Sequence, residues 1–298
     1  MTRRYATPPA FKQALEARLR AHAEQSGMPL QRVRQLVIFD RILARMVTSF
    51  GGSVILKGGL ALELRLQKAR ATKDIDVRAV GDPATFLDRL QEAGRLDLGD
   101  FMTFEVRLDR KHPELEGLEY GGRRYRAEAR LAGKLYGAAF GIDVVFAEPM
   151  TGEIETLVGS DLLAFAGIAP TPIRTYPLEA HIAEKLHALT LPRSRSNSRV
   201  KDLPDLALLG TIRPIGGTDL RSAIETTFAS RGTHDIPTSI PDPPATWARI
   251  YERLATETAL PWPDLPAVLE DARRFIDPAL AADPGTWDPI TRTWSRQP

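Results

Sequence analysis

The sequence predicts an α/β fold in which a mixed sheet is flanked by helices and followed by a mostly helical C-terminal domain. Short runs rich in β-branched and aromatic residues, such as 101–108 and 140–146, have the length and composition of strands. Segments with apolar residues at helical spacing precede and separate these runs. Beyond the last run the helical pattern dominates, so we expect two domains, residues 1–155 and 156–298.

The composition is that of an ordinary globular protein. With 298 residues, of which 43% are hydrophobic and 26% charged, the chain is long enough to bury a sizeable core. It has no apolar run that could span a bilayer and no signal peptide, so we expect a cytoplasmic protein without a membrane partner. The absence of cysteine excludes disulfides and thiolate metal sites. The net charge of +2 is too small to indicate nucleic-acid binding by itself.

Local signals place the elements around the predicted sheet. Residues 11–50 have the pattern of two helices, because apolar residues recur at helical spacing on both sides of Gly27-Met28-Pro29. A further helix is expected over residues 83–93, with Asp82 as its N-cap and a proline at the first helical position. Residues 123–131 alternate charged with small or aromatic side chains, which is typical of a strand with one wet face.

The strongest functional signal begins at Lys57-Gly58-Gly59, between the apolar run 54–56 and a Leu-rich helical segment, 60–66. A double glycine between a strand and a helix lets the backbone come close to a ligand. The first helical turn then offers unpaired N–H groups that suit a phosphate. The turn is therefore a candidate phosphate-binding loop.

A pair of acids follows it. In a strand over residues 74–77, Asp74 and Asp76 project from one face while Ile75 and Val77 face the core. Two carboxylates this close repel unless a cation lies between them, and a divalent metal suits oxygen ligands. Turn and acid pair together predict a site for a metal-bound triphosphate, although acidic pairs also occur as solubilising charges on edge strands. Five cations crowd around the two acids: Lys57, Arg65, Lys68, Arg70 and Lys73.

Asp143 is a further candidate, because it interrupts the most apolar strand, residues 140–146. A carboxylate in such a strand is costly unless it points into a site. The alternative is an edge position that faces water.

The second half of the chain is expected to be helical over 158–165 and 176–189, with a Pro-rich connection between them. Glu184 and Lys185 lie on the flank of the second helix, where a side chain can reach a cleft. A basic stretch, 193–201, is either a solvated loop or a phosphate-contacting one. The segment Lys201-Asp202-Leu203-Pro204-Asp205 then begins another helix, whose acids could be ordinary dipole complementation.

The last third is expected to form helices over 219–230, 244–255 and 265–276, separated by Pro-rich turns. It is rich in aromatic residues, for which packing between helices is a more frequent role than base stacking. These residues are Trp247, Tyr251, Trp262, Trp287 and Trp294.

Five segments follow one another along the chain: Lys57-Gly58-Gly59, the run from Arg70 to Asp76, Glu184-Lys185, the Arg-rich loop from Arg193 to Arg199 and the run from Lys201 to Leu206. In this order they resemble the AbiEii/MenT group of nucleotidyltransferase-like toxins. This group is distantly related to the polymerase β-type nucleotidyltransferases, and the resemblance covers roughly residues 33–209. Two positions depart from the pattern. Gly59 stands where many relatives carry Ser, so this position offers no hydroxyl to a phosphate, and Pro204 must lie in the first turn of its helix.

The resemblance implies a polymerase β-like nucleotidyltransferase fold with Mg²⁺ or Mn²⁺ as cofactor and an NTP as substrate. It implies that Asp74 and Asp76 are catalytic and hold the metal, and that Asp143 is the third metal ligand. Lys185 would neutralise charge on the phosphates, and Asp202 or Asp205 would orient Lys185 or the nucleotide. The implied nucleotide-binding residues are Lys57, Gly58, Gly59, Arg70, Thr72 and Asp205.

The function that follows from the resemblance is the toxin of a toxin–antitoxin pair, which transfers NMP from an NTP to RNA, with the 3′ end of tRNA as the expected acceptor. A cognate antitoxin would be its partner. One alternative keeps the chemistry and changes the acceptor to a protein or small-molecule hydroxyl. The other is a non-catalytic, nucleotide-binding interaction protein on a decayed transferase fold.

Overall fold

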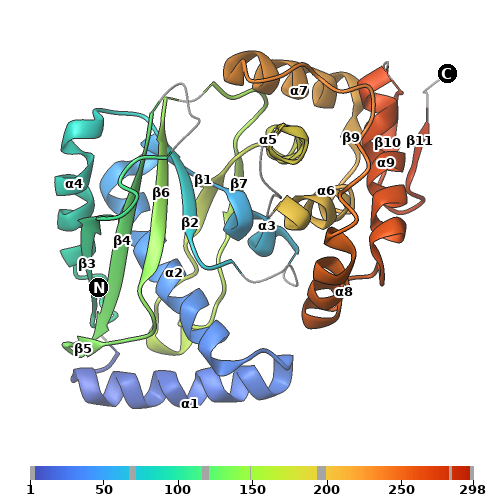
Figure 1. The fold of residues 1–298 in the computed structure, drawn as a ribbon. Coiled ribbons are helices and arrows are strands. Elements are labelled where there is room, and N and C mark those ends of the chain that lie inside the picture. Colours follow the sequence, from blue (N-terminus) through green and yellow to red (C-terminus); the bar gives the residue numbers. More distant parts are fainter. Residues whose placement is uncertain are drawn as a thin grey trace. The chain divides into compact units, whose positions relative to one another are not determined.

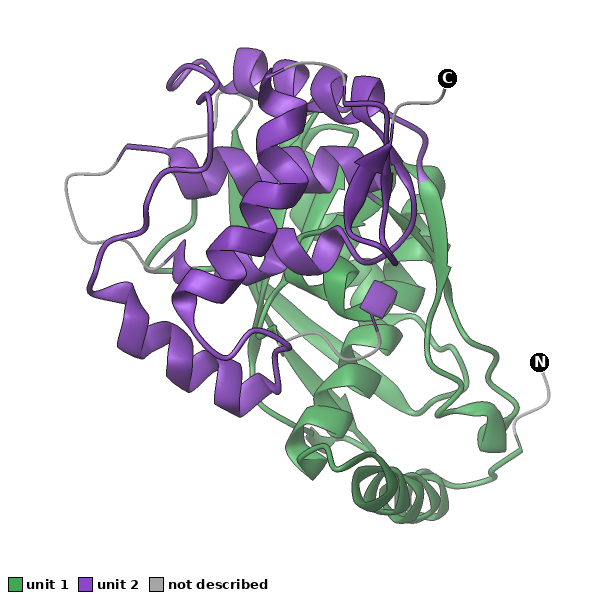
Figure 2. Cartoon of the chain, turned by 90° about the vertical axis from the view of Figure 1, so that its right-hand side faces the viewer, with its two compact units in different colours: residues 1–64, 71–148, 155–175 green, residues 65–70, 149–154, 176–298 purple. Residues whose placement is uncertain are grey.

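The computed structural model describes residues 4–66, 72–115, 121–147, 149–192, 199–281 and 284–295. The chain forms two compact units (Figure 2). Unit 1 consists of residues 1–64, 71–148 and 155–175, and unit 2 of residues 65–70, 149–154 and 176–298. No helix in the described ranges is long and apolar enough to cross a membrane.

Unit 1 is built on a mixed sheet with strand order β3-β4-β6-β2-β1-β8-β7, and β5 pairs with β4 (Figure 1). The pairs β2/β6 and β1/β8 are parallel, and the other pairs are antiparallel. The strands are β1 (Val54–Lys57), β2 (Ile75–Ala79), β3 (Met102–Leu108), β4 (Gly122–Leu131), β5 (Lys134–Leu135), β6 (Phe140–Phe146), β7 (Glu155–Val158) and β8 (Pro172–Thr175). A mixed sheet flanked by helices confirms the predicted fold class.

The helices of unit 1 begin and end where the sequence places their signals. They are α1 (Pro8–Ser26), α2 (Leu30–Phe50), α3 (Gly58–Leu66) and α4 (Pro83–Arg95), with a short 3₁₀ turn, Gly51–Ser53, after α2. Gly27 ends α1 with a left-handed φ of 70°, which a glycine adopts without strain. Asp82 caps α4 by accepting a 2.9 Å hydrogen bond from the Ala84 N–H. The predicted N-cap is confirmed.

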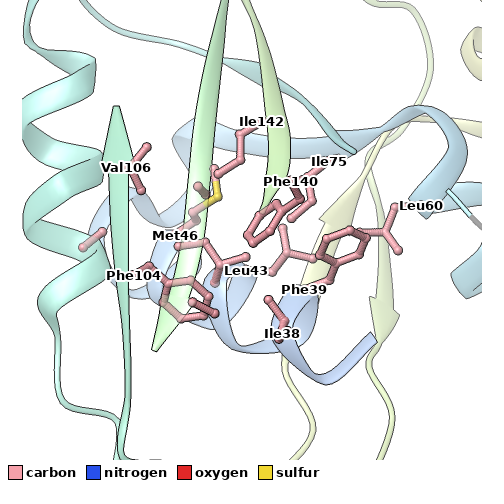
Figure 3. Packing of buried hydrophobic residues seen from close by; sticks show 14 of the residues in the cluster. Ile38, Phe39, Leu43, Met46, Leu60, Ile75, Phe104, Val106, Phe140 and Ile142 are labelled. Atoms are coloured by element: carbon pink, nitrogen blue, oxygen red, sulfur yellow. The ribbon is translucent and has the colours of Figure 1, made fainter. Parts of the chain in front are cut away.

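One face of the sheet is covered by α2, which supplies Ile38, Phe39, Leu43 and Met46 to the core (Figure 3). These side chains pack with residues of β2, β3 and β6, and the rings of Phe39 and Phe140 lie 5.1 Å apart. Burial of each large apolar side chain contributes roughly 1.5–3 kcal/mol. Because strand side chains alternate, the residues between these core positions project from the opposite face.

A buried ion network also joins α2 to the segment before β3. Arg41 Nε and Arg45 Nη2 donate to the Asp100 carboxylate at 2.7 and 2.8 Å, and Arg45 and Asp100 are fully buried. Burial alone would raise the pKa of Asp100, but the two guanidinium groups outweigh it and hold that pKa below its ordinary value. Arg41 also pairs with Asp40 at 3.3 Å, which accounts for the acid inside α2.

We expect Asp100→Asn to lower the free energy of unfolding at pH 7 by about 3–5 kcal/mol, because it leaves two buried guanidinium groups without their carboxylate. Since the folded-state pKa of Asp100 is depressed, its contribution is present above the unfolded pKa of about 4 and is lost as pH falls further. Urea unfolding at pH 7 and at pH 3 measures both effects. A variant whose stability matches that of the wild type at pH 7 would contradict this prediction.

The predicted helix over 158–165 is wrong. The chain forms β7 up to Val158 and only a short 3₁₀ turn, Ala164–Ala166. β8 pairs with β1 at Leu56 and Thr175, and β7 pairs with β8, so sheet hydrogen bonds override the local helical pattern. The predicted domain division after residue 155 falls inside β7 and ahead of β8, whereas the compact units divide after Thr175.

Unit 2 is mostly helical, as predicted. Its helices are α5 (Leu178–Thr190), α6 (Asp202–Leu209), α7 (Gly217–Arg231), α8 (Trp247–Thr258) and α9 (Leu265–Ala281), with a 3₁₀ turn, Arg199–Lys201, before α6. It also contains a small antiparallel sheet that was not predicted. Its strands are β9 (Ile215–Gly216), β10 (Thr286–Asp288) and β11 (Thr293–Ser295).

The aromatic residues of unit 2 form packing contacts. Trp287 is fully buried, its ring centroid lies 4.8 Å from that of Phe275, and its Nε1 donates to the Gly210 carbonyl at 2.7 Å. Trp294 donates to the Phe275 carbonyl at 3.0 Å. Trp247 and Trp262 are buried as well. The structure thus supports the packing role over base stacking.

Candidate active site

The glycine turn lies against the second acid of the Asp74/Asp76 pair. β1 ends at Lys57, and α3 begins at Gly58, whose φ is 66°. A Cβ on Gly58 would lie 2.8 Å from the Asp76 Cβ and would collide with the Asp76 carboxylate. A Cβ on Gly59 would lie 3.0 Å from Thr72 Oγ1. Gly58 is therefore needed for backbone and acidic strand to approach this closely, whereas a side chain at Gly59 would require Thr72 to shift by a few tenths of an ångström.

Four charged residues lie in one row across adjacent strands. In the sheet register Lys57 of β1 is opposite Asp76 of β2, Asp76 is beside Asp143 of β6, and Asp143 is opposite Arg124 of β4. Residues in register share a face, and their neighbours Ile75 and Ile142 are fully buried in the core. The row therefore lies on the face opposite α2.

The position of the row in the sheet rules out the alternative that its acids are charges on an edge strand. β2 lies between β1 and β6, and β6 lies between β2 and β4, so neither strand is at an edge of the sheet. Asp76 and Asp143 are thus two neighbouring carboxylates in the middle of a sheet. Such an arrangement is costly unless cations compensate for it, and Lys57 and Arg124 stand at its two ends.

Arg124 holds Asp143 with both ends of its guanidinium group. Its Nε donates to Oδ1 at 2.7 Å, and its Nη2 donates to Oδ2 at 2.6 Å. These hydrogen bonds, together with the charges of Asp143 and Asp74, raise the pKa of Arg124 above its ordinary value. Arg124 is therefore a permanent, fixed cation beside the acids, and it fixes the orientation of Asp143. It was not among the predicted site residues.

Asp74 is held by a backbone group rather than by a side chain. It lies just before β2, and its Oδ1 accepts a 3.0 Å hydrogen bond from the Gly141 N–H of β6. A Cβ on Gly141 would lie 2.6 Å from the same oxygen, so this position needs glycine. Asp74 is thus held toward β6, whereas Asp76 contacts the turn at Gly58, directly after β1. A glycine inside an otherwise apolar strand was the signal that could have identified Gly141.

The donor chemistry of the row fits a divalent metal. Asp76 and Asp143 offer carboxylate oxygens from two adjacent strands, and such oxygens are the ligands that Mg²⁺ and Mn²⁺ prefer. Arg124 already binds both oxygens of Asp143, so this carboxylate offers a metal only its remaining lone pairs. Among the described residues, no three His, Asp or Glu side chains meet in a metal-binding group. Asp76 is therefore the central candidate ligand.

A second cluster lies within unit 2, where α5 meets α6. Lys185 Nζ donates to Asp202 Oδ1 and to Asp205 Oδ2, each at 2.7 Å. Asp205 is fully buried and Asp202 nearly so. Pro204 is the third residue of α6 and lies in its first turn, where a proline costs no hydrogen bond. Two acids of α6, which follow Lys185 by 17 and 20 residues in the sequence, thus contact its ammonium group.

The predicted residues fall into these two clusters. Unit 1 holds Asp74, Asp76 and Asp143 together with Lys57, Gly58, Gly59 and Thr72. Unit 2 holds Lys185, Asp202 and Asp205. Arg70 and residues 193–198 of the basic loop lie outside the described residues. The catalytic roles of all these residues stay predictions.

Comparison with known proteins identifies the family. The model of the nucleotidyl transferase AbiEii toxin family, of type IV toxin–antitoxin systems, matches residues 41–278. The chain is similar in fold to MenT4, a nucleotidyltransferase toxin from Mycobacterium tuberculosis H37Rv, with 18% identity and a TM-score of 0.54 over 89% of this chain and 98% of that one. JHP933 from Helicobacter pylori is 15% identical, with a TM-score of 0.46 over 84% of this chain and 89% of that one.

No curated protein sequence matches the chain. The family match alone spans well over half of its length, from the middle of α2 to the last turns of α9. It includes the glycine turn, the charged row and the Lys185 cluster. The chain therefore belongs to the family of AbiEii nucleotidyl transferase toxins.

Proposed function

We propose that this protein is a metal-dependent nucleotidyltransferase that transfers NMP from an NTP to RNA, with the 3′ end of tRNA as acceptor, and that a cognate antitoxin restrains it. The observation that carries the proposal is the contact between the Asp76 carboxylate and a glycine turn that admits no side chain. Phosphate-binding backbone and metal-binding acid lie side by side there, which is the arrangement that a metal-bound triphosphate requires.

The turn binds the phosphates of the NTP in this proposal. The N–H groups at the start of α3 face no preceding helical turn, so they are available to phosphate oxygens. The Thr72 hydroxyl lies 3.0 Å from the position of a Cβ on Gly59. It therefore fills the space of the serine that many relatives carry there, and Thr72 supplies the hydroxyl that Gly59 lacks. Lys57 adds positive charge at the same turn.

In the proposal, Asp74 and the two acids of the row hold the metal and the acceptor hydroxyl. Asp76 and Asp74 are the proposed ligands, and Asp143 completes the set or takes the proton of the attacking hydroxyl. When bound, the metal polarises the phosphate oxygens and lowers the pKa of that hydroxyl. Arg124 keeps the Asp143 carboxylate in one orientation, which removes rotamer freedom from it in either role.

Lys185 supplies the positive charge that the reaction requires on the phosphate side. Two carboxylates hold its ammonium group, which fixes the position of the charge. We assign Asp202 and Asp205 to orienting Lys185, since both contact it directly. Its role is to neutralise charge that develops on the α-phosphate or on the pyrophosphate leaving group.

The test is to incubate the protein with each of the four labelled NTPs, with and without EDTA, in the presence of purified tRNA or of a protein extract. We expect label in tRNA with one NTP or a subset of them, and no label once EDTA removes the metal. Label in protein would identify the alternative acceptor. A growth defect that survives both Asp76→Asn and Lys185→Ala would instead identify a non-catalytic protein.

A further inference from the structure

A large basic pocket lies within unit 1, beside the first acid of the Asp74/Asp76 pair. It has a volume of about 1270 Å³ and is lined by α1, α2, the segment before β2, β4 and the connection from β5 to β6. Figure 1 shows these elements of unit 1, and α1 lies across the end of α2. Six cations line the pocket, against the acids Glu16 and Asp74. The cations are Lys12, Arg20, Arg32, Arg34, Lys73 and Arg126.

Two of the six cations are fixed in the wall. Arg32 forms an ion pair with Glu63 and also donates to the Thr72 carbonyl at 2.6 Å. Arg34 pairs with Glu16, which also accepts a 2.7 Å hydrogen bond from the Tyr136 hydroxyl. Burial alone would raise the pKa of Glu16, but the hydrogen bonds from Arg34 and Tyr136 hold it below its ordinary value. Glu16 is thus ionised and neutralises Arg34.

The other four cations have no such partner. Among the residues that the structure describes, Lys12, Arg20, Lys73 and Arg126 make no ion pair, and Asp74 is the only lining acid without an arginine partner of its own. Four like charges around one pocket repel each other, which costs free energy in the empty state. A ligand with several negative charges removes this cost.

The position of the pocket separates it from the glycine turn. Asp74 lines the pocket and is held toward β6, whereas Asp76 contacts Gly58, directly after β1. Because β2 lies between β1 and β6, pocket and turn adjoin different acids of the pair. If the NTP phosphates occupy the turn, a second phosphorylated substrate has its place on the pocket side.

We infer that this pocket binds consecutive phosphates of the acceptor RNA, an assignment that rests on the proposed function for the identity of the acceptor. Its cations come from four separate elements, α1, α2, the segment before β2, and β4, so they are spread along the pocket as a chain of phosphates requires. Its volume of about 1270 Å³ exceeds the roughly 300–1,000 Å³ of most small-molecule sites. The bound polyanion would lead its acceptor hydroxyl toward Asp74.

The test is RNA binding without nucleotide or metal, so that it does not depend on catalysis. The full-length protein and its Lys12→Ala/Arg20→Ala and Arg126→Ala variants are titrated into fluorescent tRNA at several salt concentrations. The matched control is Arg110→Ala/Lys111→Ala, which removes two exposed cations of unit 1 that do not line the pocket. Melting temperatures of all variants verify that they are folded.

We expect the double variant to bind tRNA about tenfold more weakly than the control. Each lost phosphate contact should also reduce the slope of log K against log salt by about 0.7–0.9. Wild-type affinity and slope in folded pocket variants would overturn the assignment, even if the protein transfers nucleotides. Equal binding of poly-glutamate, lost in the same variants, would also overturn it by assigning the pocket to an acidic protein segment. Weaker tRNA binding by the variants supports the pocket even if no label enters RNA, so the two proposals fail separately.

Discussion

Asp76→Asn should abolish nucleotide transfer, with a loss of at least about 10³-fold in kcat/KM, equivalent to roughly 4 kcal/mol of transition-state stabilisation. The amide keeps the size of the carboxylate and its fit against Gly58 but removes the charge that holds a divalent metal. The change also leaves Asp143 with one like-charged neighbour fewer but removes the charge opposite Lys57, so we expect little net change in the stability of the fold. Transfer rates over a range of Mg²⁺ and Mn²⁺ concentrations, with melting temperatures, measure both effects.

The matched control for this variant is Glu128→Gln, which neutralises an acid on β4 that forms a surface ion pair with Arg107 at 2.9 Å. Surface pairs of this kind contribute little to stability, and Glu128 is not in the charged row. We expect wild-type transfer from this control. Retention of more than about a tenth of the wild-type rate by Asp76→Asn would refute the metal role of Asp76.

Lys185→Ala should have two separate effects. The carboxylates of Asp202 and Asp205 would lose their shared ammonium group while they are buried, so we expect a loss of about 3–5 kcal/mol in the free energy of unfolding. In the proposed mechanism the same change removes positive charge from the phosphates and lowers kcat by about 10²–10³-fold. The first effect follows from the contacts alone, and the second follows only from the proposed role.

A triple variant distinguishes the two effects. Lys185→Met combined with Asp202→Asn and Asp205→Asn removes the whole buried charge cluster, so stability should recover while transfer stays lost. Arg253→Ala, on the exposed side of α8, is the control for loss of a cation in unit 2. A triple variant that is stable and transfers nucleotide at the wild-type rate would exclude Lys185 from the mechanism.

The sequence was sufficient for the features that depend on local chemistry. The cap at Asp82, the stop at Gly27 and the strand character of residues 140–146 follow from side chains within a few positions of each other. The approach of a glycine turn to an acidic strand is also local, because strand alternation places Asp76 opposite Ile75 and Val77 without any knowledge of their neighbours. Asp74, predicted in the same strand, lies just before it, so alternation does not decide its orientation. These signals were sufficient for the family and the fold class.

Only the tertiary structure decided which partners these groups have. Arg124 meets Asp143, and Gly141 meets Asp74, because of the register in which β4, β6 and β2 pair. A shift of one residue in either pairing would turn the side chains to the other face, and nothing in the sequence of one strand specifies its neighbour. The same reason explains the error over residues 158–165 and the unforeseen basic pocket. Both depend on segments far apart in the chain that the folded sheet brings together.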